Sequence, residues 1–149
     1  MPDIRRILCA TDFSGASKHA YEYAVDLAAK LGAAVSVIHA YQIPAYTLPD
    51  GMVEVPVEVE TSVRERLNEQ LREFSRSIDT KGVSVDVHLL DGVPYVEITH
   101  AARELKADLV VIGTHGRTGL AHLLLGSVAE RVVRTCEAPV LTIRGPGNA

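Results

Sequence analysis

Five segments of the chain have the hydrophobic pattern of β-strands. Four are largely apolar runs, at residues 4–11, 34–40, 108–112 and 138–143. The inner part of the first is apolar on both faces, as in a parallel sheet that helices cover. The fifth run, 83–90, alternates Val and Leu with polar residues. Strict alternation predicts a strand that is exposed on one side, at a sheet edge.

Helical periodicity separates these strands. The first helix follows Ser14, an N-cap residue, and ends at Gly32; the second spans 57–81 and ends at Gly82. The third begins at Pro94, and the last follows Gly126. The predicted inner faces are Ala16, Ala20, Tyr23, Ala24, Leu27, Ala28 and Leu31; Val63, Leu67, Leu71, Phe74 and Ile78; Val96, Ile98, Ala101, Ala102 and Leu105; and Leu123, Leu124, Val128, Val132 and Val133.

The order of these elements predicts an α/β fold. Strands and helices alternate, which is typical of an open five-stranded parallel sheet with helices on both faces, as in Rossmann-like proteins. Residues 1–144 form one predicted domain and 145–149 a flexible tail, while the proline-rich segment 41–56 has the composition of a loop. In such sheets ligands bind beyond the carboxyl ends of the strands, where the strand order reverses. The first and fourth strands are therefore expected to border the site.

Composition excludes several classes of function. The chain has 149 residues, 47% of them hydrophobic, and a net charge of −4, which gives no support for a nucleic-acid partner. No apolar run approaches the ~18 residues of a membrane span, and no signal-peptide region precedes the first strand, so we expect a cytoplasmic protein. Cys9 and Cys136 have no metal-binding or disulfide spacing, and Cys9 is expected in the core.

A glycine-rich segment follows the fourth strand. It contains Gly113, Gly116 and Gly119 and ends with Gly126-Ser127, where a helix is predicted to start. Glycines let the backbone approach a ligand closely, and the free N–H groups of a helix start attract phosphate. Neither GxxxxGK[ST] nor GxGxxG is present, so the segment matches neither common phosphate-binding motif.

The spacing of these glycines resembles a known motif. Gly113-x-x-Gly116, nine further residues and then Gly126-Ser127 resemble the nucleotide-binding motif of the universal stress protein family, in its ATP-binding branch. The runs 10–14, 91–94 and 138–141 also resemble this family. The resemblance implies its five-stranded parallel fold, of the adenine nucleotide alpha hydrolase-like type, and a homodimer paired through the last strand at 139–143.

The resemblance also implies which residues hold the nucleotide. ATP, or AMP or ADP, would lie between the end of the first strand and segment 113–127, with Mg²⁺ or Mn²⁺ on its phosphates. The base and ribose would meet Ala10, Thr11 and Asp12, with Val37 or a neighbour as a wall. The remaining implied contacts are Ile112, Gly113, His115, Gly116, Arg117, Gly126, Ser127 and Val128. Many members have Pro where this chain has Ala10, which leaves the shape of the first loop open.

Three functions compete at this point. The first is a nucleotide-binding stress-response or regulatory protein, in which phosphates order loop 114–125. The second is a slow ATP hydrolase, for which only Asp12, His115 and a phosphate-bound metal are available, without an orienting motif for a base. The third is a nucleotide-free dimeric interaction module. Asp12 also has a simpler interpretation as a cap of the first helix together with Ser14, and no histidine spacing indicates a protein metal site.

Overall fold

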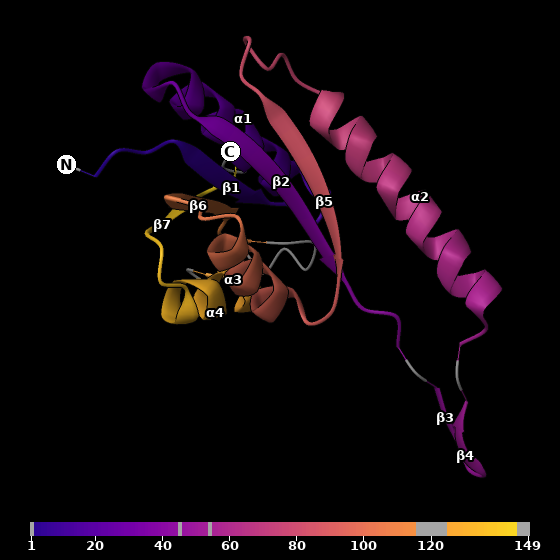
Figure 1. Ribbon diagram of the computed structural model, residues 1–149. Coiled ribbons are helices and arrows are strands. Elements are labelled where there is room, and N and C mark those ends of the chain that lie inside the picture. The colour runs from indigo at the N-terminus through magenta and orange to yellow at the C-terminus, as the bar shows by residue number, and fades with distance from the viewer. Residues whose placement is uncertain (1, 45, 54, 116–124, 146–149) are drawn as a thin grey trace.

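The protein is built around one parallel β-sheet. The structure, a computed structural model, describes residues 2–44, 46–53, 55–115 and 125–145. The sheet has the strand order β5-β2-β1-β6-β7 and confirms the predicted α/β architecture (Figure 1). Its strands are β1 (Arg6–Ala10), β2 (Ala34–Tyr41), β5 (Val85–Asp91), β6 (Leu109–Gly113) and β7 (Val140–Ile143).

Helices cover both faces of the sheet. Along β1 the side chains alternate, so Ile7 and Cys9 join the core under α1 and α2, whereas Leu8 and Ala10 join the core under α3 and α4. All four side chains are at most 6% exposed, as expected for a central strand of a two-sided α/β protein. The helices are α1 (Gly15–Leu31), α2 (Val57–Arg76), α3 (Pro94–Glu104) and α4 (Ser127–Thr135).

The predicted signals set both ends of α1. The Ser14 hydroxyl accepts a hydrogen bond from the Ser17 N–H at 3.2 Å and so caps the first turn. At the other end Gly32 adopts the left-handed conformation, with φ of 69°. Pro94 likewise begins α3, where its missing N–H costs no helical hydrogen bond.

The prediction for the end of α2 is wrong by about one turn. The helix stops at Arg76 rather than Lys81, and the Ser77 N–H bonds back to the Phe74 carbonyl. Lys81 has a positive φ of 53°, which no helical residue adopts, and it lies with Gly82 in the turn that leads into β5. The edge strand therefore starts at Val85 and not at 83.

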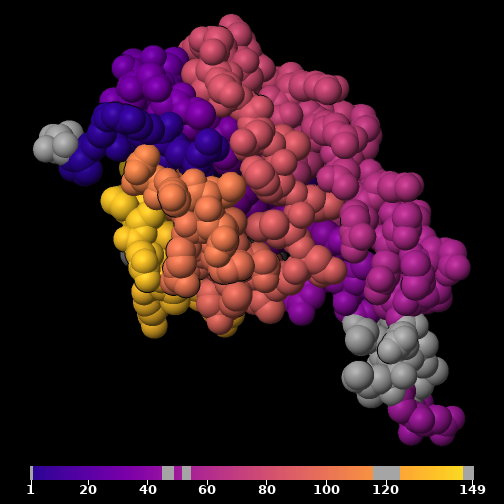
Figure 2. Space-filling view, viewed as in Figure 1, coloured from indigo at the N-terminus to yellow at the C-terminus, as the bar shows by residue number. Residues whose placement is uncertain are grey.

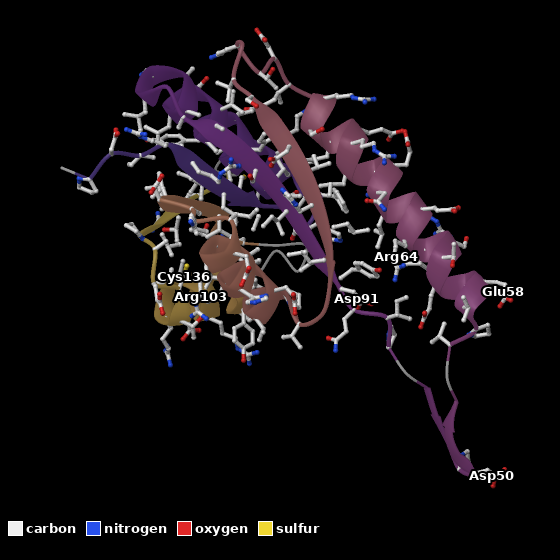
Figure 3. All side chains as sticks on the ribbon, viewed as in Figure 1. Asp50, Glu58, Arg64, Asp91, Arg103 and Cys136 are labelled. Carbon is white, nitrogen blue, oxygen red and sulfur yellow. The ribbon has the colours of Figure 1, made fainter. Side chains whose placement is uncertain are left out.

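The predicted loop 41–56 contains a β-hairpin. Strands β3 (Tyr46–Leu48) and β4 (Gly51–Val53) pair antiparallel as a separate two-stranded sheet. The hairpin stands away from the main sheet, beyond the start of α2, and its turn is the far tip of the molecule (Figures 1 and 2). Asp50 marks this tip, well separated from Arg103 of α3 (Figure 3). Gly51, with φ of 129°, provides a turn conformation that other residues rarely adopt.

Some predicted inner-face residues point outward. Tyr23 and Leu31 of α1 are 48% and 47% exposed, whereas Tyr21 and Val25 are buried. The buried face of α1 is rotated toward α2 relative to the predicted face, because the helix packs against α2 as well as the sheet. The Tyr21 ring stacks on the Phe74 ring of α2, with 5.4 Å between the ring centroids. The other outward residues are Val96 in α3 and Val133 in α4, whereas Leu123 and Leu124 lie outside the described residues.

A helix that crosses a bilayer needs about 20 largely apolar residues. None of the helices in the described ranges has both the length and the apolar character that this requires.

Removing the Tyr21 hydroxyl is expected to weaken the contact between α1 and α2. Its O–H donates to the Ser75 carbonyl at 2.7 Å. Tyr21→Phe should lower the free energy of unfolding by ~1 kcal/mol, as for a typical lost hydrogen bond. Tyr23→Phe, on the exposed side of the same helix, is the matched control and should change it by less than ~0.5 kcal/mol. Urea unfolding at pH 7 measures both; equal effects would contradict the prediction.

Alkaline pH is expected to destabilise the fold through Cys9. Complete burial raises the pKa of this thiol from 9.0 to about 12. The folded state therefore holds the proton more tightly, so the stability from the neutral thiol is complete below pH 9 and is lost as pH rises toward 12. The slope should approach ~1.4 kcal/mol per pH unit. Cys9→Ala should flatten the fall in unfolding free energy between about pH 9 and pH 10; an unchanged slope would refute this.

Candidate functional site

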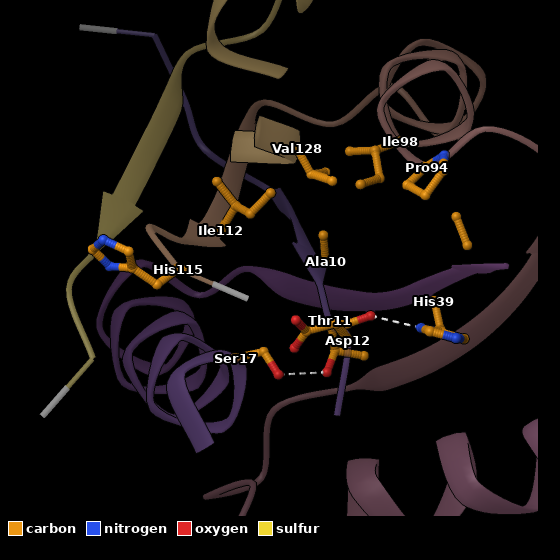
Figure 4. A pocket seen from close by; sticks show the side chains of 12 residues that line it. Ala10, Thr11, Asp12, Ser17, His39, Pro94, Ile98, Ile112, His115 and Val128 are labelled. Atoms are coloured by element: carbon orange, nitrogen blue, oxygen red, sulfur yellow. Dashed lines mark hydrogen bonds between the residues drawn. The ribbon is translucent and has the colours of Figure 1, made fainter. Parts of the chain in front are cut away.

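A cavity lies where the strand order reverses. The chain leaves β1 toward β2 on one side, and β6 lies on the other side of β1, so their carboxyl ends diverge around a crevice. The cavity has a volume of about 130 Å³ (Figure 4). Its lining is Ala10, Thr11, Asp12, Ser17, His39, Ala40, Pro94, Ile98, Ile112, Gly113, His115 and Val128.

Thr11 organises the floor of this cavity. Its hydroxyl oxygen accepts the Phe13 N–H at 3.0 Å and lies 2.9 Å from the Ser17 hydroxyl. The Ser17 O–H donates to the Ser14 carbonyl at 2.9 Å, so Thr11 must be the donor to Ser17. These bonds hold Phe13 in a left-handed conformation, with φ of 67°, that non-glycine residues seldom adopt.

Asp12 has the structural role that the sequence left open. Its Oδ1 accepts the Ser14 N–H at 3.0 Å, and Ser14 in turn caps α1. Asp12 therefore holds the turn that leads into the helix. It also lines the cavity, so its position is compatible with contact to a ligand.

His39 is a cavity residue that the sequence reasoning missed. Its Nδ1 lies 2.8 Å from the Thr11 carbonyl oxygen (Figure 4). A carbonyl oxygen can only accept, so Nδ1 carries the proton. The ring centroid lies 4.3 Å from that of Phe13, which holds the imidazole from the other side. The sequence could have indicated His39 as a site residue, because it lies near the carboxyl end of β2, the strand that pairs with β1.

On β2 the cavity is lined by neighbours of Val37 and not by Val37 itself. Val37 is fully buried in the core under α1 and α2 and does not line the cavity. The lining residues of β2 are His39 and Ala40 instead. Other lining residues absent from the predicted set are Ser17 of α1 and Pro94 and Ile98 of α3, which meets the opposite face of the sheet.

The described ends of the glycine-rich segment meet each other. The Thr114 N–H donates to the Ile143 carbonyl at 2.9 Å, and the Gly126 N–H donates to the Thr114 carbonyl. The predicted residues Gly116 and Arg117 lie outside the described residues. Space alone does not require glycine at position 113, because a Cβ there would lie 3.4 Å from the Ala16 carbonyl oxygen, which is van der Waals contact.

The start of α4 faces this junction. Gly126 is its N-cap, and it has no side chain with which to bond the first N–H groups. Ser127 is the first residue of the helix, and Val128 lines the cavity. The helix start therefore presents polar N–H groups beside an apolar wall, an arrangement suited to an anion attached to an apolar group.

His115 lies at the edge of the cavity. Its Nδ1 is 3.0 Å from the Thr114 hydroxyl. Within the described ranges no three His, Cys, Asp or Glu side chains cluster closely enough to hold a metal ion.

Comparison with known proteins gives consistent matches. The model of the universal stress protein family matches residues 3–144. The chain is 37% identical over 144 residues to universal stress protein MJ0531 of Methanocaldococcus jannaschii, covering 95% of this chain and 83% of the relative. It is similar to a universal stress protein solved in complex with cAMP (TM-score 0.73, 25% identity, 97% and 100% coverage). It is also similar to a universal stress protein from Archaeoglobus fulgidus in complex with dAMP. The TM-score is 0.60 and the sequence identity 25%, and the match covers 95% of this chain and 98% of the other.

Replacing the Thr11 hydroxyl should destabilise the floor of the cavity. Thr11→Val keeps the shape but leaves the Phe13 N–H without this acceptor and Ser17 without this donor. The expected loss is ~1–3 kcal/mol of unfolding free energy, because these groups are largely removed from water. Thr142→Val, at a half-buried Thr of β7, serves as the control and should change it by less than ~0.5 kcal/mol. Equal losses in urea unfolding would argue against the proposed network.

Proposed function

The chain belongs to the universal stress protein family, and from that premise we propose that it is a regulatory stress-response protein that binds an adenine nucleotide in the cavity. The observation that carries the proposal is the backbone of Ala40. Two further features support it, the apolar lining of the cavity and the start of α4. The cAMP and dAMP complexes of its relatives agree with a ligand of this class.

The position of Ala40 follows from the alternation of β2. Ile38 accepts the Thr11 N–H and so faces β1, whereas Val35 and Tyr41 bond toward β5. Ala40, two residues after Ile38, therefore turns its N–H and C=O toward the β1 side, and β1 has ended at Ala10. A donor and an acceptor thus face the crevice side by side.

This pair of groups matches adenine and mismatches guanine. Adenine has an N1 acceptor beside its 6-amino donor, so the Ala40 N–H and C=O can bond both. Guanine has an N1–H donor beside an O6 acceptor, which would place donor against donor and acceptor against acceptor. Discrimination of this kind is strong because the mismatched groups lose their hydrogen bonds to water without replacement.

The apolar lining suits the faces of a base. Ala10 and Ile112 come from the sheet, Ile98 from α3 and Val128 from α4, all on the same side of the sheet. Binding pockets of this kind are mainly apolar, with a few polar groups that fix the orientation of the ligand. A flat base between these side chains would have its polar edge directed toward Ala40.

The phosphates would extend to the start of α4. Ser127, the first residue of the helix, offers its N–H group there and adds a hydroxyl, whereas the Gly126 N–H is already bonded to the Thr114 carbonyl. A triphosphate would bring more negative charge to this helix start than AMP or ADP, which favours ATP. Mg²⁺ or Mn²⁺ would neutralise phosphate charge when bound, with the phosphates as its main ligands and the cavity residues Asp12 and His115 as candidate protein contacts.

The edge of the sheet suggests the dimer. β7 is an outer strand whose Val140 and Leu141 are only half-buried, so its backbone can pair with a second copy. We propose a homodimer through residues 139–143. Sedimentation equilibrium of wild type and Leu141→Lys tests this: a monomeric wild type would refute the dimer, and a dimeric variant would argue against this edge.

The proposed function predicts that the protein prefers adenine nucleotides and that a larger side chain in the cavity weakens their binding. Wild type should bind ATP at least ~10-fold more tightly than GTP, which corresponds to ~1.4 kcal/mol. Ala40→Leu should weaken ATP binding by a similar factor or more by occupying the base site. Ala34→Leu, on the same face at the opposite end of β2, is the matched control and should bind as wild type. Calorimetry measures each affinity.

Nucleotide released by denaturing the purified protein identifies the natural ligand. Released ATP that is lost in Gly126→Val, with the fold intact, would support the assignment. Released AMP or ADP would call for a turnover assay, which separates binding from slow hydrolysis. Protein that contains no nucleotide and ignores millimolar ATP would refute the proposal.

A further inference from the structure

The pairing of β1 with β2 ends at the cavity, which its last residue Ala10 lines. The register ends at Ala10–Ile38, and the last backbone bond runs from the Thr11 N–H to the Ile38 carbonyl at 2.8 Å. In a parallel ladder the next bond would join the Ala40 N–H to the Thr11 carbonyl. Both residues are described, and the register does not extend to the Thr11–His39 pair that this bond would create.

The Thr11 carbonyl has a side-chain donor in that position. Nδ1–H of His39 donates to it at 2.8 Å, so the imidazole takes the acceptor that would otherwise continue the ladder. A buried carbonyl needs a partner, and the histidine supplies one without requiring the two strands to stay paired. β1 and β2 can therefore separate at this point while the Thr11 carbonyl keeps a hydrogen-bond donor.

We propose that His39 is a positioning residue for the base: by bonding the Thr11 carbonyl, it keeps the Ala40 N–H directed into the cavity. The effect on base binding, the ligand half of this proposal, rests on the proposed function. The effect on the Ala40 N–H, the backbone half, concerns the protein alone. His39 acts through Ala40 and need not touch the nucleotide.

Packing fixes the imidazole in this role. The Phe13 ring lies 4.3 Å from the His39 ring, and the Phe74 ring of α2 lies 5.9 Å from Phe13 in an edge-on arrangement. Aromatic contacts of this kind restrict side-chain rotation. Phe13 itself has a left-handed φ of 67°, a conformation that non-glycine residues seldom adopt.

Amide hydrogen exchange tests the backbone half directly. In His39→Leu the Thr11 carbonyl loses its donor, and the Ala40 N–H is expected to replace it, so Ala40 exchange should slow at least ~10-fold relative to wild type. His39→Asn keeps a donor near the Nδ1 position and should behave as wild type. His88→Leu, on the neighbouring strand β5 and outside the cavity, is the control. Unchanged Ala40 exchange in His39→Leu would overturn the proposal.

Nucleotide affinity tests the ligand half in the same variants. His39→Leu should weaken ATP binding ~10-fold and reduce the preference for ATP over GTP, because one of two base contacts is lost. His39→Asn should restore both to within ~3-fold of wild type. A role limited to stability would leave the ATP-to-GTP ratio unchanged in the folded fraction, and that result would also overturn the proposal.

The two measurements separate the possible failures. If wild type binds no ATP but His39→Leu slows Ala40 exchange, the proposed function fails and the backbone role of His39 stands. If wild type binds ATP and Ala40 exchange does not respond, the role of His39 fails alone. If His39→Leu does not fold, His39→Gln takes its place. The glutamine amide donor lies near the Nε2 position of histidine and not near Nδ1, so this variant should show the same loss as His39→Leu and not the recovery seen in His39→Asn.

Discussion

The candidate site depends on how β1 ends. A central parallel strand must satisfy backbone groups on both sides, and at Thr11 side chains take over this task from the ladder. The Thr11 hydroxyl serves the turn and α1, while its carbonyl is bonded by His39. Because both backbone groups of Thr11 keep partners, the strands can diverge here, and the divergence creates the crevice in which the cavity residues meet.

Much of the layered architecture could be predicted from the sequence because it depends on the spacing of apolar residues within each short segment. Four apolar runs and one alternating segment identified the five main strands, and the cap residues Ser14, Gly32 and Pro94 act through their immediate neighbours. The order of elements also predicted that Gly113, at the end of β6, lies beside the end of β1. These features require no knowledge of which residues pack together.

The errors lie where distant contacts decide the outcome. Tyr21 is buried in place of Tyr23 because α2 covers α1, and helical spacing alone does not reveal that second neighbour. Val37 and Ala40 are equally plausible as wall residues until the register of β2 shows which one lies beyond the end of β1. The left-handed Lys81, which follows the early end of the second helix, reflects the tight turn needed to bring β5 back to the sheet.

The bond between the Gly126 N–H and the Thr114 carbonyl separates two parts of the chain that could change independently. Because this bond joins residues 114 and 126 directly, the length of chain between them does not determine where α4 begins. Doubling the length of a closed flexible loop adds only ~0.6 kcal/mol of closure entropy. Insertions there could thus change the surface beside α4 while the part of the cavity lined by β1, β2 and α3 keeps its shape.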